Sequence, residues 1–254
     1  MKINLRTILC FLFVVAFLVL SMPIHLVVWI IGKKDPMKKF RISYKVIRWA
    51  FSTILWIVGV KVNTIGKENI PTDRPVLFVS NHRSNLDILA TQTSCGVPVG
   101  FVAKKELGKV PLFGLWMQDI GCVFLDRANI KSAIKVMTEG AEHIKLGCSM
   151  QICPEGTRGH AEEMKEFKDG SLKIATKAMA PVVPVAVIGT DDCWENNPGI
   201  KLTKGYITIC YGKPIDLSTL EPEQKKHLGA YTQAFVKELY DAHKAENDAL
   251  NIKK

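Results

Sequence analysis

Short apolar runs alternate with helical segments over most of the chain. The runs lie beyond residue 60, are rich in Val, Ile and Phe, and have the length of strands. Between two of them, apolar residues from Ile130 to Ile144 recur at three- and four-residue spacing, with Asn129 placed to cap a helix and Gly147 to end it. This alternation predicts an α/β fold with a mostly parallel central sheet flanked by helices. The runs fall near residues 61–65, 76–80, 99–103, 121–125, 149–153, 182–188 and 206–211.

Polar clusters follow three of these runs directly. Sheets of this class bind ligands beyond the carboxyl ends of their strands, so we expect the three clusters to form one shared site. The clusters are Asn81-His82-Arg83-Ser84-Asn85-Leu86-Asp87, Asp126-Arg127 and Pro154-Glu155-Gly156-Thr157-Arg158.

His82 and Asp87 are five residues apart, which would place them on different faces of a continuous helix. They can meet only if the chain turns between them. In that case a carboxylate orients an imidazole, and His82 can act as a general base. The alternative is a loop histidine beside an Asp87 that, with Ser84, only caps a helix. The chain has no G-x-S-x-G elbow, so direct attack by a substrate hydroxyl is simpler than an acyl-serine intermediate.

Arg127 and Arg158 indicate an anion site, because arginine recognises phosphate through two parallel hydrogen bonds. Gly156 allows close approach of the backbone, and Lys104 could add attraction. Each of the basic residues, taken alone, is more often a solvated charge on the protein surface. Glu155 in the same cluster would have to be neutralised by an arginine or bind a substrate hydroxyl.

Residues 8–31 contain no charged side chain and are long enough to span a bilayer. A cleaved signal peptide is the competing interpretation, but no clear cleavage site follows. A second apolar segment, 47–60, carries Trp49 and Trp56; it is either a membrane-contacting helix that pairs with the first or a core helix. We therefore expect membrane-anchoring hydrophobic helices over residues 1–60 and an α/β domain over 61–254.

The distribution of charge agrees with a membrane role. Residues 1–66 contain ten Lys and Arg against one acidic residue, Asp35, a net +9 of the total +10. The remainder is nearly neutral, which fits an anionic membrane surface and argues against a nucleic-acid-binding face. Basic residues directly after the apolar segment predict that the domain faces the cytoplasm. The seven scattered cysteines include no C-x-x-C pair, so we expect reduced thiols and no metal site.

Four motifs, in this order and approximate spacing, are similar to those of the glycerolipid acyltransferases, and the chain resembles the bacterial 1-acyl-sn-glycerol-3-phosphate acyltransferases from about residue 60 to 215. Any one motif is weak evidence, whereas four in order are strong evidence. The motifs are Asn81-His82 with Asp87, Phe124-Leu125-Asp126-Arg127, Pro154-Glu155-Gly156-Thr157-Arg158 and Val183-Pro184-Val185.

The resemblance implies transfer of an acyl group from an acyl-CoA or acyl carrier protein thioester to the sn-2 hydroxyl of lysophosphatidate, giving phosphatidate. It implies that His82 is the general base and that Asp87 holds its imidazole. It assigns substrate-phosphate binding to six residues, and it implies no tightly bound cofactor and no metal. The six residues are Lys104, Arg127, Glu155, Gly156, Thr157 and Arg158.

Two positions depart from the family pattern, namely Cys153, where Phe is frequent, and Gly159, where Ser is frequent. Both leave the acceptor open, so another lysophospholipid is an alternative. A hydrolase in which His82 activates water, and a non-catalytic lipid-binding protein, are rivals from other classes.

Overall fold

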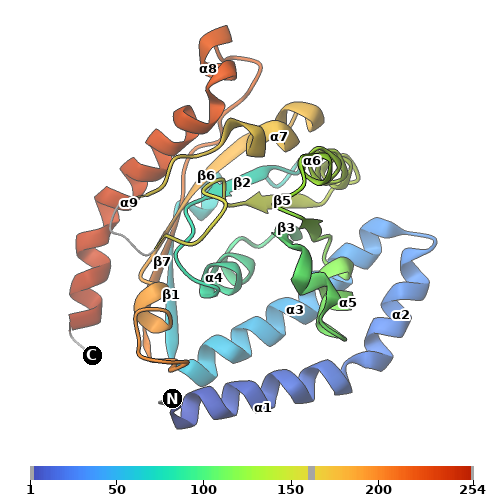
Figure 1. Cartoon of the computed structure of the whole chain (residues 1–254), viewed down its shortest axis with the longest axis vertical. Helices are drawn as coiled ribbons and strands as arrows, with labels where there is room; N and C mark the ends of the chain where they lie inside the picture. The colour runs from blue at the N-terminus through green and yellow to red at the C-terminus, as the bar shows by residue number, and fades with distance from the viewer. Residues whose placement is uncertain (1–2, 160–163, 253–254) are drawn as a thin grey trace.

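The computed structural model describes residues 3–159 and 164–252 and confirms the α/β fold (Figure 1). One sheet contains seven strands, and each begins within two residues of a predicted run. The strands are β1 (Val60–Ile65), β2 (Leu77–Ser80), β3 (Val99–Lys104), β4 (Val123–Leu125), β5 (Ser149–Ile152), β6 (Val182–Ile188) and β7 (Gly205–Tyr211).

The strand order is β1-β7-β6-β2-β5-β3-β4, and the sheet is mostly parallel, as predicted. β6 and β7 pair antiparallel, and β1 pairs parallel with β7, so β1 and β7 run opposite to the other five strands. The reason lies in the connection after β6, which contains a short 3-10 turn, η4 (Asp191–Cys193), and no α-helix. Without a helical crossover, the chain returns beside β6 in the opposite direction.

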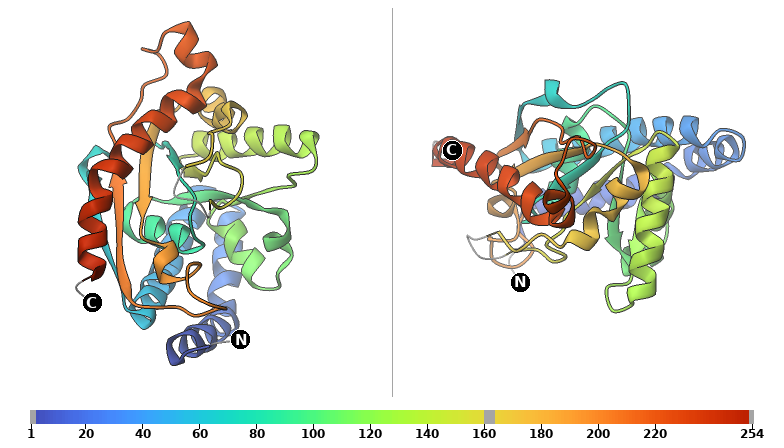
Figure 2. Two further views of the ribbon diagram at one scale, coloured as in Figure 1. Left: turned by 60° about the vertical axis from the view of Figure 1, so that its left-hand side comes forward. Right: turned by 90° about the horizontal axis from the view of Figure 1, so that it is seen from above.

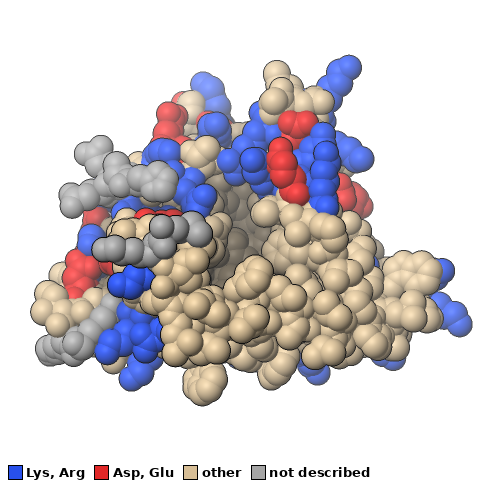
Figure 3. Space-filling model, turned by 60° about the horizontal axis from the view of Figure 1, so that its bottom comes forward, with Lys and Arg blue, Asp and Glu red and all other residues tan. Residues whose placement is uncertain are grey.

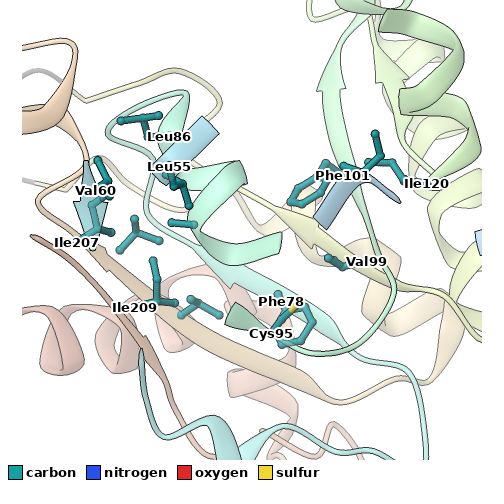
Figure 4. Packing of buried hydrophobic residues seen from close by; sticks show 14 of the residues in the cluster. Leu55, Val60, Phe78, Leu86, Cys95, Val99, Phe101, Ile120, Ile207 and Ile209 are labelled. Atoms are coloured by element: carbon teal, nitrogen blue, oxygen red, sulfur yellow. The ribbon is translucent and has the colours of Figure 1, made fainter. Parts of the chain in front are cut away.

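Alternate residues of the sheet pack into two hydrophobic clusters. In β2, Phe78 contributes to one cluster, while Leu77 and Val79 contribute to the other. Figure 4 shows the first cluster, where Phe78 lies beside Cys95. The second cluster includes Met137 of α6 (Ile130–Lys145) and Val236 of the C-terminal helix, and Figures 1 and 2 show where these two helices lie. The helices after β2 are α4 (Leu86–Ser94), α5 (Phe113–Asp119), α6 (Ile130–Lys145), α7 (Lys173–Ala178), α8 (Pro222–Lys226) and α9 (Leu228–Ile252).

The predicted ends of α6 are confirmed. The Asn129 side chain accepts hydrogen bonds from the N–H groups of Lys131 and Ser132, and Gly147 follows the helix with φ of 101°. That backbone conformation strongly favours glycine, so this residue ends the helix.

The uncharged N-terminal stretch forms two helices, α1 (Leu5–Leu20) and α2 (Met22–Gly32), with a 51° bend at Ser21. Pro23 lies in the first turn of α2, where its missing N–H is tolerated. Among the described residues no single helix meets the length and hydropathy of a membrane span, whereas α1 and α2 together do.

The third helix, α3 (Pro36–Val58), fits both interpretations of the second apolar segment. Ile47 and Leu55 are buried in the cluster that contains Phe78, whereas Trp49 and Trp56 are exposed. The division of the chain at residues 60 and 61 stays a prediction.

A buried carboxylate joins the N-terminal helices to the sheet domain. Asp119 in α5 is within 2.9 Å of the Lys39 ammonium of α3 and also contacts the His25 ring of α2. Nearby, the indole N–H of Trp116 donates to the Ser21 hydroxyl at the α1–α2 bend. Three N-terminal elements are therefore held by α5.

We expect Asp119→Asn to destabilise the protein by about 3 kcal/mol, because it leaves the Lys39 ammonium without its buried counter-charge. For a chain of this size the melting temperature should fall by roughly 6–12 °C. Calorimetry in detergent measures this shift. Asp73→Asn is the matched control, because the Asp73 side chain is 66% exposed and should contribute almost nothing. Equal melting temperatures for the two variants would contradict the role given to Asp119.

Candidate active site

The polar clusters meet because β2 pairs in parallel with β5, with Val79 opposite Ile152. The chain leaving β2 and the chain leaving β5 therefore emerge at the same edge of the sheet. The backbone N–H of His82 donates to Glu155 Oε1 at 2.7 Å, and the N–H of Gly159 donates to the carbonyl of His82 at 2.9 Å. These bonds fix the two loops against each other.

His82 and Asp87 are in contact, as the first interpretation of their spacing requires. The distance from His82 Nδ1 to Asp87 Oδ2 is 2.8 Å. Asp87 lies in the first turn of α4, and the same oxygen accepts the N–H groups of Arg83 at 2.8 Å and Ser84 at 3.0 Å. Asp87 therefore holds the turn before the helix and binds the histidine with the same oxygen, whereas the N-cap residue of α4 is Asn85.

The Asp87 carboxylate is completely buried, and its second oxygen accepts the Thr190 hydroxyl at 2.6 Å. A carboxylate held by four donors cannot rotate freely, and it can only accept hydrogen bonds. His82 Nδ1 is therefore the donor, which leaves the lone pair of the ring on Nε2. An imidazole held in this tautomer can accept a proton at Nε2.

His82 lines a cavity of about 990 Å³ that has a polar part and an apolar part. The apolar part is formed by α1, α3, α4 and α5 and includes Phe17, Ile54, Leu89 and Trp116. Figure 3 shows the molecule hollowed between two groups of Lys and Arg, above a broad, mostly uncharged surface. The polar part includes His82, Lys104, Arg127, Gly156, Thr157, Arg158 and Lys165.

The two predicted arginines and Lys104 all reach this cavity, but in different states. Arg158 donates to Glu195 Oε1 at 2.9 Å. Lys104 is more than half exposed and lies 3.6 Å from Glu106. Arg127 is exposed, and within residues 3–159 and 164–252 no carboxylate forms an ion pair with it. Together they make this part of the cavity strongly basic.

The assignment of Glu155 to the substrate phosphate stays a prediction, and the structure places this side chain against two backbone N–H groups. Its side chain is buried, with one oxygen on the His82 N–H and the other on the Lys165 N–H at 3.1 Å. Burial raises the pKa of this carboxyl, and the two N–H donors oppose the shift. Both oxygens are committed to backbone donors, so the observed role of Glu155 is to hold the loops.

Lys165, Thr190 and Glu195 belong to the site and were missed from sequence. Lys165 Nζ donates to Thr157 Oγ1 at 2.9 Å and to the carbonyl of Arg158 at 3.1 Å. A lysine seven residues after Arg158 carries no sequence signal. Thr190 carries such a signal, because it follows the apolar run 182–188 just as His82 follows the run 76–80.

Comparisons with known proteins show which family this chain is similar to. A sequence model of the Acyltransferase family matches residues 61–188. The probable 1-acyl-sn-glycerol-3-phosphate acyltransferase of Mycoplasma genitalium is 33% identical over 218 residues, covering 82% of this chain and 81% of that protein. The 1-acyl-sn-glycerol-3-phosphate acyltransferase of Borreliella burgdorferi is 29% identical, covering 74% and 75%.

The fold is also that of a solved structure. The crystal structure of the 1-acyl-sn-glycerophosphate (LPA) acyltransferase PlsC from Thermotoga maritima superposes with a TM-score of 0.68 at 24% identity, over 92% of this chain and 97% of that one. The family match and the relatives confirm the resemblance seen in the motifs. This chain belongs to the acyltransferase family.

Proposed function

We propose that this enzyme transfers a fatty acyl group from an acyl thioester to the sn-2 hydroxyl of 1-acyl-glycerol-3-phosphate, forming phosphatidate. The observation that carries the proposal is the composition of a single cavity. His82 stands on its wall together with a basic group and a long apolar section. An anionic lysolipid and an acyl chain both find suitable surroundings there. The relatives named above carry the same activity in their names.

In the proposed reaction, His82 Nε2 takes the proton of the sn-2 hydroxyl as its oxygen attacks the thioester carbonyl. The tetrahedral intermediate then collapses, the carbon–sulfur bond breaks, and the leaving thiolate takes the proton from the imidazolium. Asp87 keeps the ring oriented and stabilises its charged form. The thioester is already activated, so acyl-CoA or acyl carrier protein serves as co-substrate and no tightly bound cofactor is required.

The glycerol phosphate fits the basic part of the cavity. Arg158 and Arg127 supply guanidinium groups, Thr157 supplies a hydroxyl, and Lys104 and Lys165 add positive charge. A phosphate dianion is well matched to such a group because charge-assisted hydrogen bonds are about twice as strong as neutral ones. Glu155 supports this site from behind through the backbone of Lys165.

The apolar part of the cavity is suited to a fatty acyl chain. The whole cavity, with a volume of about 990 Å³, lies at the upper end of the range for small-molecule pockets, about 300–1,000 Å³, and the apolar part is one section of it. Its walls come from the N-terminal helices as well as from α4 and α5. An acyl chain in this section would be withdrawn from water while its carboxyl end remains near His82.

We further propose that α1 and α2 lie on an anionic membrane and that the domain faces the cytoplasm. Their exposed apolar residues include Phe11, Leu12 and Leu20. Lys33 lies 3.7 Å from the centre of the Trp29 ring, an arrangement suited to the interface between lipid and water. The cluster of basic residues after α2 supports the cytoplasmic orientation.

The first test is acyl transfer by purified protein in detergent with labelled lysophosphatidate and each thioester donor. We expect His82→Ala to lower the rate of phosphatidate formation by at least about 100-fold, because the general base is lost. Circular dichroism checks that the variant is folded. The preferred thioester identifies the donor.

Three outcomes would contradict the proposal. Full activity of folded His82→Ala rejects the mechanism. Acylation only of lysophospholipids without a terminal phosphate rejects the acceptor. Release of free fatty acid at the same rate with and without lysophosphatidate indicates a hydrolase.

A second prediction concerns Cys153, a thiol on the cavity wall. Burial raises its pKa to about 12, with the Ser80 hydroxyl opposing the shift in part. At pH 8 the thiol therefore stays largely protonated, which disfavours an acyl-cysteine route because the thiolate is the nucleophile. Cys153→Ser should keep activity within about threefold, and brief iodoacetamide treatment at pH 8 should leave the wild type active. Rapid inactivation with label on Cys153 would contradict this.

A third prediction concerns the membrane surface. Leu20 is 75% exposed at the end of α1, so Leu20→Glu should weaken binding to vesicles containing an anionic phospholipid by at least about tenfold. Co-sedimentation measures the bound fraction. Met179→Glu, at a residue that is 77% exposed beyond α7, introduces the same charge away from these helices and should bind like the wild type. Equal losses in both variants would show that the site of the charge does not matter.

A further inference from the structure

The chain between β6 and β7 reaches across the candidate active site and contacts both halves of it. It starts at the carboxyl end of β6, beside β2, and includes the turn η4. At its far end, the Leu202 N–H donates to the Thr7 hydroxyl of α1 at 2.9 Å. Figure 2 shows this segment as an orange loop that extends from the sheet toward the N-terminus. The segment is therefore held at one end by the sheet and at the other end by α1.

Thr190 supplies the contact to the histidine–aspartate pair. Its hydroxyl lies 2.6 Å from Asp87 Oδ1, and both residues are fully buried. The three other donors to Asp87, on His82, Arg83 and Ser84, all lie on Oδ2. Thr190 therefore holds the second carboxylate oxygen, and together with the donors on Oδ2 it fixes the rotation of the carboxylate against which the His82 ring is held.

Glu195 supplies the contact to the phosphate-binding part. Its Oε1 accepts from Arg158 Nη1 at 2.9 Å, and from the backbone N–H and side-chain amide of Asn85 at 3.0 and 3.2 Å. Asn85 is the N-cap residue of α4, the helix that carries Asp87. One nearly buried carboxylate oxygen thus holds the guanidinium and the start of the catalytic helix together.

Asp191 completes the attachment between these two residues. Its Oδ2 accepts from Arg83 Nε at 3.1 Å and from Nη2 at 2.9 Å. Arg83 directly follows His82, so the segment contacts the loop of the base as well as its aspartate. Segment 190–195 therefore contacts Asp87, Arg83 and Arg158.

We infer that Thr190 and Glu195 are positioning residues for acyl transfer, Thr190 for the His82–Asp87 pair and Glu195 for Arg158. Neither belongs to the four motifs, and the inference rests on the proposed function. The two residues act on different steps. Loss of Thr190 should lower kcat, because it disturbs proton transfer, whereas loss of Glu195 should raise KM for the phosphate-bearing acceptor.

The test is steady-state kinetics with lysophosphatidate and the preferred thioester. Thr190→Val should lower kcat about tenfold with both KM values unchanged, and Thr190→Ser, which keeps the hydroxyl, should restore most of the rate. Glu195→Ala should raise KM for lysophosphatidate about tenfold, with KM for the thioester unchanged and kcat within about threefold. Glu195→Gln, which keeps an acceptor oxygen, should recover most of this affinity.

Matched controls are Thr138→Val, on the exposed face of α6, and Glu142→Ala, whose glutamate side chain is exposed and pairs with the exposed Lys145. Both should behave like the wild type. A parallel loss of kcat and both affinities in the Thr190 and Glu195 variants, with a lowered melting temperature, would indicate a purely structural role and overturn the inference. So would wild-type kinetics. If Thr190→Val or Glu195→Ala does not fold, failure of the serine and glutamine variants to keep activity overturns it.

The same assay separates this inference from the proposed function. An active wild type, an inactive His82→Ala and an unaffected Thr190→Val overturn the inference alone. A wild type that forms no phosphatidate overturns the proposed function and this inference with it.

Discussion

The parallel pairing of β2 with β5 on one side and β6 on the other is the interaction on which the rest of the site depends. Val79 lies opposite both Ile152 and Pro184, and all four residues of β2 are buried. Because the three strands point the same way, the loops that follow them end at one edge. His82, Glu155 and Thr190, which are far apart in sequence, become neighbours there. The hydrogen bonds from His82 to Glu155 and from Thr190 to Asp87 are possible because the sheet has already fixed these distances.

The fold could be predicted from sequence because its signal is local. Each strand is a short run of apolar residues, and the ends of α6 follow from Asn129 and Gly147 alone. The reversed direction of β1 and β7 could not be predicted in this way. It depends on the conformation of the β6–β7 connection, which has turn residues but no periodic pattern to show whether it crosses the sheet or turns back.

The site was predictable where residues face the cavity and unpredictable where they support it. His82, Arg127 and Arg158 reach the cavity, but their spacing could not show that Thr190, 103 residues beyond Asp87, holds the carboxylate. Glu155 belongs to a predicted motif, but it supports the loops from behind the cavity. A carboxylate in a motif looks the same in sequence whether it faces a ligand or two backbone N–H groups. The cavity itself depends on how α1 and α3 pack on α4 and α5, which no single segment encodes.

The position of β1 at the edge of the sheet has a consequence for the order of folding. Its partner is β7, and Val60 lies opposite Gly205, so 144 residues must be synthesised between the two. At about 5–20 residues per second, β1 waits roughly 7–30 s for its neighbour. During that time α1, α2 and α3 have been synthesised, but the sheet that later covers the apolar face of α3 is incomplete. A nascent chain in this state exposes more apolar surface than the finished protein and is correspondingly prone to aggregate until β7 has been synthesised.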